Sequence, residues 1–454
     1  MNKKENKISK EIKINKKLAR RNYSNQTGIT LIALVVTIVV LLILAGVSIN
    51  ALFSENGIIK RAQDAQNKMN NAQESDLNAL NDLDKWINNQ VNGTTGGNTT
   101  GGNDNPSTTP KISTLVGKVV DKNTKAEDAY GNKITIPKGF KILEHNPTSS
   151  TGAVTYNYTN SEETGEHIPA VQDGIVIEDT QTGTAGNQFV WVPVGTIKNK
   201  NGSTNTITLG RYEFDSSTGA LKSTTPAQVA SVENCTKIVT ISKGGTDYQE
   251  LSTFREGNSA TNSTAQNATA RNLEEFISTT LANGGYYIAR FEASGTASKI
   301  ASKYNQTVLG NITQPNAAKA AREMYGEIKE NNKLVYASDL VNSYAWDTAI
   351  IFIQTYSGKT DYASHNESNT TKAFTATGKN NDKYCNIFDM SGNASEWTTE
   401  YSTDSYIINF PPCVIRGGCY NPANGSGHYT SYRSGSNPTS SYSNTGLRPL
   451  LYVK

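Results

Sequence analysis

The chain has 454 residues, of which 36% are apolar and 18% are charged. This charged share lies below the usual value of about 25%, so we expect a polar but weakly charged surface. The formal net charge of +3 creates no overall field that attracts nucleic acid, and no nucleic-acid partner is expected. The length predicts more than one structural unit.

Residues 1–28 form a basic segment. They contain seven lysines and two arginines against two glutamates, and an uncharged apolar run follows directly. Basic residues next to a membrane-spanning segment mark its cytoplasmic side. We therefore predict a basic cytoplasmic leader. A nucleic-acid-binding arm is the less favoured interpretation.

The apolar run Ile29–Val47 contains no charged residue. Its 19 residues come close to the roughly 20 that an α-helix needs to cross a bilayer core. Apolar residues then recur at spacings of three and four as far as Ile87, which indicates an amphipathic helix. The pattern predicts a transmembrane and stalk helix over 29–91, in a single-pass membrane protein with its C-terminal part outside.

The junction between leader and helix reads TGITLI, with Gly28 followed by Ile29. This motif resembles the processing site of type IV pilins and pseudopilins. The resemblance implies cleavage between Gly28 and Ile29 by a prepilin peptidase, methylation of the new N-terminus and assembly with other pilin-like subunits. The family's usual Glu is replaced by Ala33, which implies a minor or tip subunit. An ordinary single-pass anchor is the alternative.

Residues 92–110 are rich in Gly, Thr and Asn, and we expect a flexible linker there. After the linker, strand-like runs alternate with Gly, Asn and Pro turns, and two segments have helical character. The expected strands are Leu115–Val120, Ile134–Ile136, Phe189–Val194, Thr206–Leu209, Lys237–Ile241 and Tyr286–Glu292, and the expected helices are Asn316–Glu327 and Ser343–Tyr356. This mixture predicts the α+β class, with residues 111–188 as a β-rich first part.

Residues 189–454 carry an ordered set of motifs. The set comprises Phe189–Pro193, Gly285–Glu292, Ala345–Ala349, Asn386–Trp397, Ile415–Gly418 and Gly446–Arg448. Together they resemble the domain of formylglycine-generating enzymes, or sulfatase-modifying factors. The resemblance implies a C-type-lectin-like fold over this range.

The same resemblance bears on activity. The family's chemistry needs two cysteines shortly after the Gly-Gly turn, and the matching positions here are Pro422 and Gly427. Cys419 stands where the family usually has Ser. The resemblance therefore implies a non-catalytic member that binds no copper. A surface enzyme with relocated residues stays open as the alternative.

A calcium site is the next implication of the resemblance. The family holds a cation through positions that match Asp389, the backbone oxygens of Gly392 and Ala394, and Glu396. An all-oxygen ligand set suits Ca²⁺. The alternative is a purely structural turn in which Trp397 fills the core.

The segment Tyr420–Asn444 is rich in Tyr, Ser, Asn and Gly. Tyr gives contact area at low entropic cost and the small polar residues give adaptable hydrogen bonds, as in antibody paratopes. The segment also resembles the variable region of receptors diversified by retroelements. We expect an extracellular glycan or protein ligand to contact Tyr420, Tyr429, Tyr432, Arg433 and Tyr442. The alternative is a polar loop without a ligand.

These features together predict a surface-displayed minor pilin or adhesin, with a purely structural pseudopilin as a further alternative. The cysteines Cys235, Cys385, Cys413 and Cys419 lack the CxxC spacing of a zinc or redox site. Two disulfides and free thiols are both compatible with their number. The four histidines show no metal-binding spacing.

Overall fold

The computed structural model describes most of the chain after the predicted linker. The described residues are 109–157, 167–222, 228–231, 239–243, 246–250, 273–330, 333–367, 373–402, 413–420 and 429–454, with Val35, Val36 and Val39. The chain divides into two compact units, Met1–Asp104 and Asn105–Lys454.

The predictions for the leader, the processing site at Gly28 and Ile29, the stalk and the linker fall almost entirely outside the described residues. Val35, Val36 and Val39 are helical. No helix in the described part of the chain is both long and apolar enough to cross a membrane.

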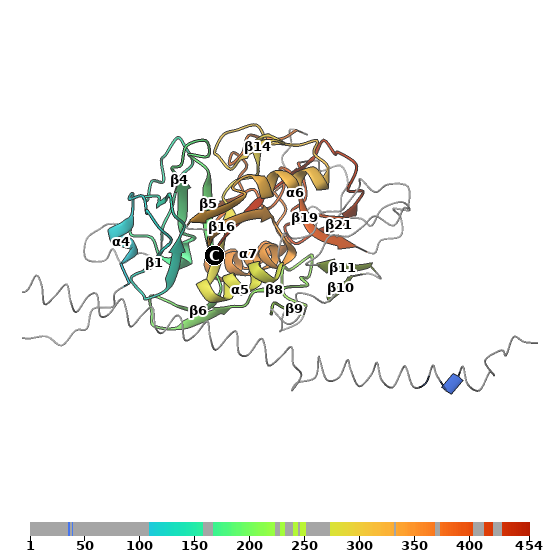
Figure 1. Ribbon diagram of the computed structural model, residues 1–454, viewed down its shortest axis with the longest axis horizontal. Coiled ribbons are helices and arrows are strands. Elements are labelled where there is room, and N and C mark those ends of the chain that lie inside the picture. The colour runs from blue at the N-terminus through green and yellow to red at the C-terminus, as the bar shows by residue number, and fades with distance from the viewer. Residues whose placement is uncertain are drawn as a thin grey trace, which may run out of the picture. The chain divides into compact units, whose positions relative to one another are not determined.

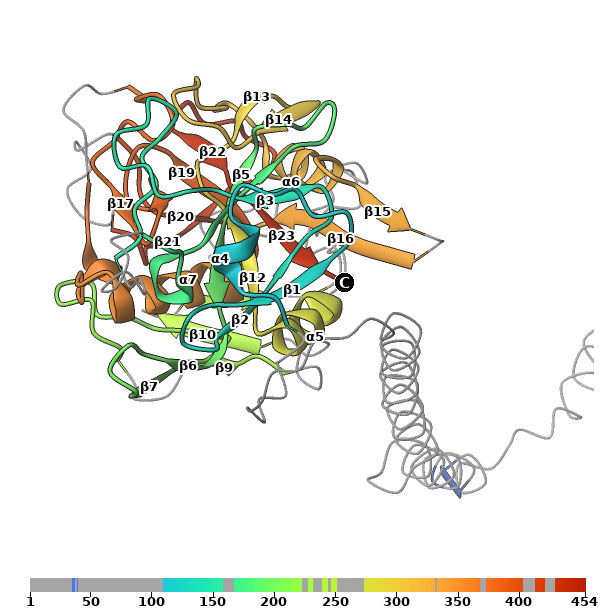
Figure 2. The same ribbon diagram turned by 90° about the vertical axis from the view of Figure 1, so that its left-hand side faces the viewer.

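A seven-stranded antiparallel sheet forms the centre of the second unit. Its spatial order is β15 (Glu327–Glu330), β16 (Lys333–Leu340), β23 (Pro449–Val453), β12 (Gly285–Ala289), β5 (Gln188–Pro193), β4 (Val176–Asp179) and β3 (Phe140–Ile142). Every residue of β5, β12 and β23 is buried, whereas β15 and the first residues of β16 project from one edge of the sheet as a hairpin (Figure 2). The sheet takes β3 and β4 from residues 111–188 and the other strands from 189–454, so both ranges build one core.

A second sheet carries most of the motif residues. Its order is β10 (Val239–Lys243), β11 (Thr246–Glu250), β19 (Ser395–Ser402), β20 (Cys413–Arg416) and β21 (Arg433–Ser436), all antiparallel. The strand β22 (Thr445–Leu447) pairs parallel to β19. All eight residues of β19 are buried, which places this strand inside the unit.

Five two-stranded ladders complete the strands of the described part. They are β1 (Thr124–Glu127) with β2 (Lys133–Ile136), β6 (Gly195–Lys198) with β7 (Thr204–Ile207), β8 (Gly210–Arg211) with β9 (Gln228–Val229), β13 (Ser294–Thr296) with β14 (Lys299–Ala301), and β17 (Lys383–Tyr384) with β18 (Ile387–Phe388).

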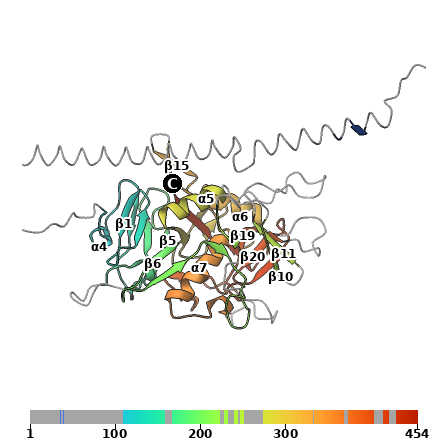
Figure 3. The ribbon, with the colours of Figure 1, turned by 90° about the horizontal axis from the view of Figure 1, so that it is seen from below.

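Three helices pack against the sheets (Figure 1). The helix α5 (Leu273–Asn283) contacts β12 and β23, α6 (Gln314–Glu323) contacts β16 and β19, and α7 (Ser343–Tyr356) contacts β5 and β19. Figure 3 shows α5 beside the C-terminus, where Lys454 Nζ lies 2.7 Å from Glu275 Oε2. The short elements are α4 (Ile112–Leu115), η1 (Val171–Asp173) and η2 (Tyr362–Ser364).

Local sequence explains where α7 begins. The side-chain oxygen of Asn342 accepts a hydrogen bond of 2.9 Å from Ala345 N, as an N-cap residue does. The helix then buries eleven of its fourteen residues, which explains why its sequence is apolar on nearly all sides. The structure confirms the predicted helix Ser343–Tyr356 residue for residue.

Most of the expected strands are also confirmed, in β2, β5, β7, β10 and β12, with shifts of a few residues. The predicted strand Leu115–Val120 is wrong, because Leu115 ends α4 and only isolated bridges follow. The helix α5 was missed, although its buried residues Leu273, Phe276, Ile277 and Thr280 follow a helical spacing. The mixed fold with many strands and few helices agrees with the predicted α+β class.

Candidate functional site

The motif turn after β17 has an unusual backbone. Five of its residues have positive φ: Cys385 at 45°, Asn386 at 62°, Asp389 at 57°, Gly392 at 81° and Asn393 at 53°. Non-glycine residues rarely adopt this region. Such conformations persist only where the surroundings enforce them, and they cluster at functional sites.

Hydrogen bonds from side chains of the turn hold these backbone conformations in place. The amide of Asn386 donates to the backbone oxygens of Thr155, Asp173 and Gly174 at 2.8–3.2 Å, and its oxygen accepts from Thr155 N at 3.0 Å. These bonds tie the turn to a segment more than two hundred residues earlier in the chain. The turn is therefore shaped by tertiary contacts.

The second half of the turn is held in the same way. Asn393 Oδ1 accepts from Thr375 N at 2.9 Å, and its Nδ2 donates to Glu292 Oε2 at 2.5 Å. A Cβ atom on Gly392 would lie 1.9 Å from Glu367 O, so only glycine fits at this position.

The predicted calcium ligands lie together in this turn, but one of them already has a cationic partner. The buried carboxylate of Glu396 accepts from Arg448 Nη2 at 2.7 Å and from Arg448 Nε at 2.9 Å. The Arg448 guanidinium also donates to Asp389 O at 3.1 Å. Ala394 N donates to Glu292 Oε1 at 2.8 Å. Glu396 is thus neutralised by Arg448.

Asp389 is less fully satisfied than Glu396. Its Oδ2 accepts from Gly378 N at 2.6 Å, while its Oδ1 is buried without a hydrogen-bond partner in the described part of the chain. Burial raises the pKa of Asp389 and of Glu292, and repulsion between neighbouring carboxylates raises both further. We call Glu292, Asp382, Asp389 and Glu396, with Arg448, the acidic cluster.

The acidic cluster contains two of the predicted calcium ligands, Asp389 and Glu396. Asp389 Oδ1 is available as an oxygen ligand, but the oxygens of Glu396 are engaged by Arg448. Among the described residues, no group of three or more His, Cys, Asp or Glu side chains is placed to hold a metal ion. Calcium at Asp389, Gly392, Ala394 and Glu396 stays a prediction of the resemblance.

The tyrosine-rich segment begins and ends on the second sheet. Its described parts include Tyr420, Tyr429, Tyr432 and Tyr442, all of which are half-buried, and residues 421–428 lie outside the described part. The rings of Tyr429 and Tyr432 meet edge to face with centroids 5.5 Å apart. The ring of Tyr420 meets Phe374 in the same way at 5.1 Å.

Two of the predicted ligand contacts need revision. The ring of Tyr442 lies 6.0 Å from that of buried Trp397, and its hydroxyl accepts from Asn437 N at 3.2 Å. Tyr442 therefore helps to hold the scaffold. The prediction for Arg433 is wrong, because this residue is only 5% exposed and its guanidinium pairs with Asp347 and Glu400 inside the protein.

Arg433 belongs to a buried network that we call the arginine network, formed by Arg211, Arg416, Arg433, Glu400 and Asp347. Glu400 accepts from Arg211 Nη2 at 2.5 Å, from Arg416 Nη1 at 3.1 Å and from Arg433 Nε at 3.1 Å. Asp347 on α7 pairs with Arg416 and Arg433. Burial alone would raise the pKa of Glu400, but the three guanidiniums lower it to about 2. The network joins β8, β19, β20, β21 and α7 beneath the tyrosine-rich segment.

A second anchor holds Thr430, in the residues just before β21. Thr430 N donates to His365 O at 3.0 Å, and the indole of Trp346 donates to Thr430 O at 3.0 Å. His365 Nε2 lies 3.4 Å from Glu367 Oε2 and 3.7 Å from Asp382 Oδ1. Burial raises the pKa of Asp382 to about 7.

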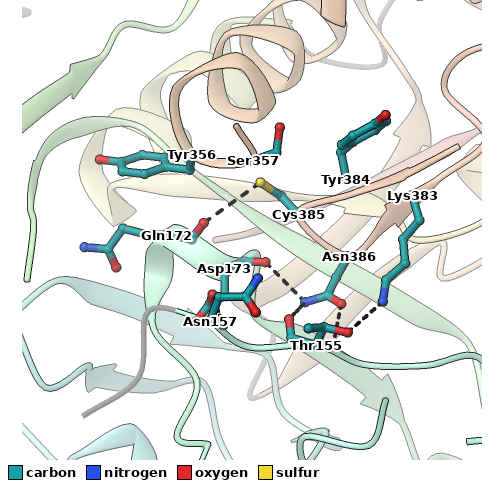
Figure 4. A pocket seen from close by; sticks show the side chains of 10 residues that line it. All are labelled: Thr155, Asn157, Gln172, Asp173, Tyr356, Ser357, Lys383, Tyr384, Cys385 and Asn386. Atoms are coloured by element: carbon teal, nitrogen blue, oxygen red, sulfur yellow. Dashed lines mark hydrogen bonds between the residues drawn. The ribbon is translucent and has the colours of Figure 1, made fainter. Parts of the chain in front are cut away.

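A polar pocket of about 200 Å³ lies beside Cys385 and Asn386 of the motif turn (Figure 4). Its lining residues are Thr155, Asn157, Gln172, Asp173, Tyr356, Ser357, Lys383, Tyr384, Cys385 and Asn386. Lys383 Nζ donates to Thr155 Oγ1 at 2.9 Å, and burial followed by repulsion from Arg290 lowers the pKa of Lys383 to about 8. No local sequence pattern predicts this pocket, because its two walls, residues 155–173 and 356–386, lie far apart in the chain.

Part of the second unit matches a known protein family. Residues 298–451 match the family of the Sulfatase-modifying factor enzyme 1-like domain. The match covers α6, α7, the motif turn and the first part of β23, in agreement with the resemblance seen in the motifs. No curated protein sequence matches the chain.

Several solved structures share a low level of similarity with the chain. CarF is 15% identical, covering 44% of this chain and 92% of its own, with a TM-score of 0.26. Treponema denticola variable protein 1 is 13% identical, covering 46% and 97%, with a TM-score of 0.25. The Major Tropism Determinant I1 variant is 14% identical, covering 76% and 98%, with a TM-score of 0.25. TM-scores this low establish no common fold.

Three described cysteines, Cys385, Cys413 and Cys419, lie within the matched residues 298–451. The Cys385 thiol is free, which rules out two disulfides within the chain. Burial raises the pKa of the Cys385 thiol, which disfavours the reactive thiolate. Cys419 is buried and accepts a hydrogen bond of 3.2 Å from Asn444 Nδ2. Pro422 and Gly427 lie outside the described residues, and the lack of enzymatic activity stays a prediction.

Proposed function

We propose that the second unit, Asn105–Lys454, is a binding module whose tyrosine-rich segment contacts an extracellular ligand. The observation that carries the proposal is the edge-to-face pair Tyr429–Tyr432. This pair is half-exposed and lies directly after residues 421–428, just before β21. Aromatic rings held in this way lose little entropy when a partner covers them.

The support beneath these rings favours the same function. Arg433 follows Tyr432 directly and is held by Glu400 and Asp347, while Thr430 is held by His365 and Trp346. Binding residues commonly lie on loops that a rigid scaffold positions. Contacts at such a preorganised face keep more of their interaction energy as affinity.

We further propose that residues 29–91 anchor and display this module at the cell surface in the manner of a minor or tip pilin. The support is the sequence motif around Gly28 and Ile29, preceded by the basic leader. A prepilin peptidase would then release a chain that begins at Ile29. Mass spectrometry of the membrane-extracted protein tests this, and a mature chain that starts at Met1 in cells with an active peptidase would contradict it.

The binding proposal is tested with the full-length chain on an array of immobilised oligosaccharides and extracellular-matrix proteins. We expect binding to at least one class of probe. In the double variant Tyr429→Ala/Tyr432→Ala, binding should weaken by roughly thirtyfold, since aromatic anchors commonly contribute on the order of 2 kcal/mol or more.

Two controls separate a role in binding from a role in folding. The variant Tyr429→Phe/Tyr432→Phe keeps both rings and should retain most of the binding. Tyr130→Ala removes a half-buried tyrosine from the loop between β1 and β2 and should bind like the unmodified chain. Unchanged binding in the double alanine variant would place the ligand face elsewhere. A chain that binds no probe would argue against the binding proposal itself.

A further inference from the structure

A hollow of about 510 Å³ lies next to the tyrosine-rich segment and has no role in the predictions from sequence. Its lining consists of residues 306–311 together with Gly295, Phe374 and Ser443. The volume is within the range of small-molecule sites, which is roughly 300–1,000 Å³. The hollow is distinct from the polar pocket of Figure 4 and shares no lining residue with it.

The wall formed by residues 306–311 is fixed by its backbone. Gln306 exchanges hydrogen bonds with Thr377, accepting from Thr377 N at 2.9 Å and donating its own N–H to Thr377 Oγ1 at 3.0 Å. Leu309 N donates to Ala293 O at 2.8 Å. The hollow is thus preformed, as ligand sites usually are.

Two contacts join the hollow to the proposed binding face. Phe374, on one wall, meets the ring of Tyr420 at 5.1 Å. On another wall, Ser443 follows Tyr442, and Asn311 N donates to Tyr442 O at 3.1 Å. A ligand in the hollow would therefore lie beside the tyrosine-rich segment.

Glycine at position 310 keeps the hollow open beside the aromatic ring. A Cβ atom there would lie 2.5 Å from Cε2 of Phe374 and 3.4 Å from Ser443 O. Any larger residue would push the Phe374 ring or close the space in front of it. The ring is half-buried and remains part of the wall.

The chemistry of the lining points to an uncharged ligand. The exposed side chains of Gln306, Thr307, Asn311 and Ser443 offer amide and hydroxyl groups. Among the described residues, no Asp, Glu, Lys, Arg or His lines the hollow. A charged ligand would lose hydration without gaining an ionic partner. The polar pocket of Figure 4 differs, because Lys383 and Asp173 line it.

We infer that this hollow is a subsite for a neutral saccharide. A pyranose ring carries hydroxyls that match the amide and hydroxyl groups of the walls. It also presents C–H groups on one face, which the negative face of an aromatic ring such as Phe374 attracts. The inference rests on the proposed binding function and specifies the ligand class of that function.

The test uses the full-length chain on an array that carries neutral oligosaccharides, sialylated and sulfated oligosaccharides, and extracellular-matrix proteins. The variant Thr307→Trp places an indole in the hollow from an exposed position. We expect it to weaken binding to neutral oligosaccharides by roughly tenfold or more. Thr196→Trp, on an exposed position of β6 outside the hollow, is the matched control and should bind normally.

A second variant guards against misfolding. Phe374→Leu keeps an apolar side chain but removes the ring, and it should also weaken neutral-saccharide binding while the melting temperature stays close to that of the unmodified chain. Full binding by both variants, or a preference for the charged oligosaccharides, would overturn the inference. Binding to matrix proteins alone, lost in Tyr429→Ala/Tyr432→Ala, would overturn it and leave the proposed function intact. A chain that binds no probe would contradict both.

Discussion

Two clusters of buried charged residues share the strand β19. The arginine network has more guanidiniums than carboxylates, whereas the acidic cluster has more carboxyls than guanidiniums. Around Glu400, three guanidiniums face two carboxylates. Around Glu396, only four residues earlier, Arg448 is the one guanidinium among the described residues that pairs with the acidic cluster. Each guanidinium of the arginine network is therefore paired with at least one carboxylate, whereas the carboxyls of the acidic cluster outnumber their guanidinium partner and burial raises their pKa.

The contrast suggests different roles for the two ends of β19. The arginine network fixes β20 and β21, which carry the tyrosine-rich segment, and it would hold that scaffold at any ordinary pH. The acidic cluster shapes the motif turn, and its carboxyls depend on protonation. Substitutions that remove a carboxylate from each cluster should reveal this difference.

The largest effect is expected for Glu400→Gln. This change leaves three buried guanidiniums with a single carboxylate, and uncompensated buried charge costs about 3–5 kcal/mol of stability. Denaturant unfolding of the full-length chain measures the loss.

The matched change is Glu396→Gln in the acidic cluster. Here Arg448 can still be compensated by the nearby Asp389 and Glu292 carboxyls, so we expect a smaller loss of about 1–2 kcal/mol. Equal losses for the two variants would show that the clusters do not differ in the way described.

We expect the dependence of stability on pH to come from the acidic cluster, through Asp382. Asp382 has a pKa of about 7 in the folded protein, against about 3.9 in an unfolded chain. Between these values the folded state binds one more proton, so the free energy of unfolding falls as the pH rises from about 4 to 7.

Asp382→Asn isolates this contribution. The variant removes the titrating group, and its melting temperature should fall less than that of the unmodified chain over the same pH range. Glu250, which has a pKa of about 7 because of burial, contributes equally to both proteins and cancels in the comparison. Parallel melting curves at all pH values would show that Asp382 does not titrate in this window.

The smallest effect is expected from a chelator. Because Arg448 already neutralises Glu396, the geometry predicts an unchanged melting temperature when EDTA is added at neutral pH. A fall in melting temperature that Asp389→Asn abolishes would instead show a bound divalent cation. That result would support the calcium site implied by the family resemblance.

The sequence predicted the elements whose local pattern is strong. The helix α7 was predicted from the helical character of Ser343–Tyr356, and the motif turn was located from the residues Asn386–Trp397. Arg433 was misjudged because an arginine within a polar segment has the composition of a surface residue. Its partners Glu400 and Asp347 lie 33 and 86 residues away.

The polar pocket and the hollow lined by residues 306–311 were not predicted from the sequence, for the same reason. Each combines segments far apart in the chain, and none of the segments has a distinctive pattern of its own. Gly310 and Phe374, for example, are 64 positions apart and carry no motif. Only tertiary contacts such as those of Asn386 with Thr155 and Gly174 bring such walls together.

Tyr429 and Tyr432 thus contact the ligand in the proposed function, while the arginine network holds the fold. The most direct test measures array binding and melting temperature on the same samples of Tyr429→Ala/Tyr432→Ala. We expect this variant to lose binding and keep its melting temperature, while Glu400→Gln loses stability. A Tyr429→Ala/Tyr432→Ala variant that unfolds as readily as Glu400→Gln would contradict the account, because these tyrosines would then be part of the core.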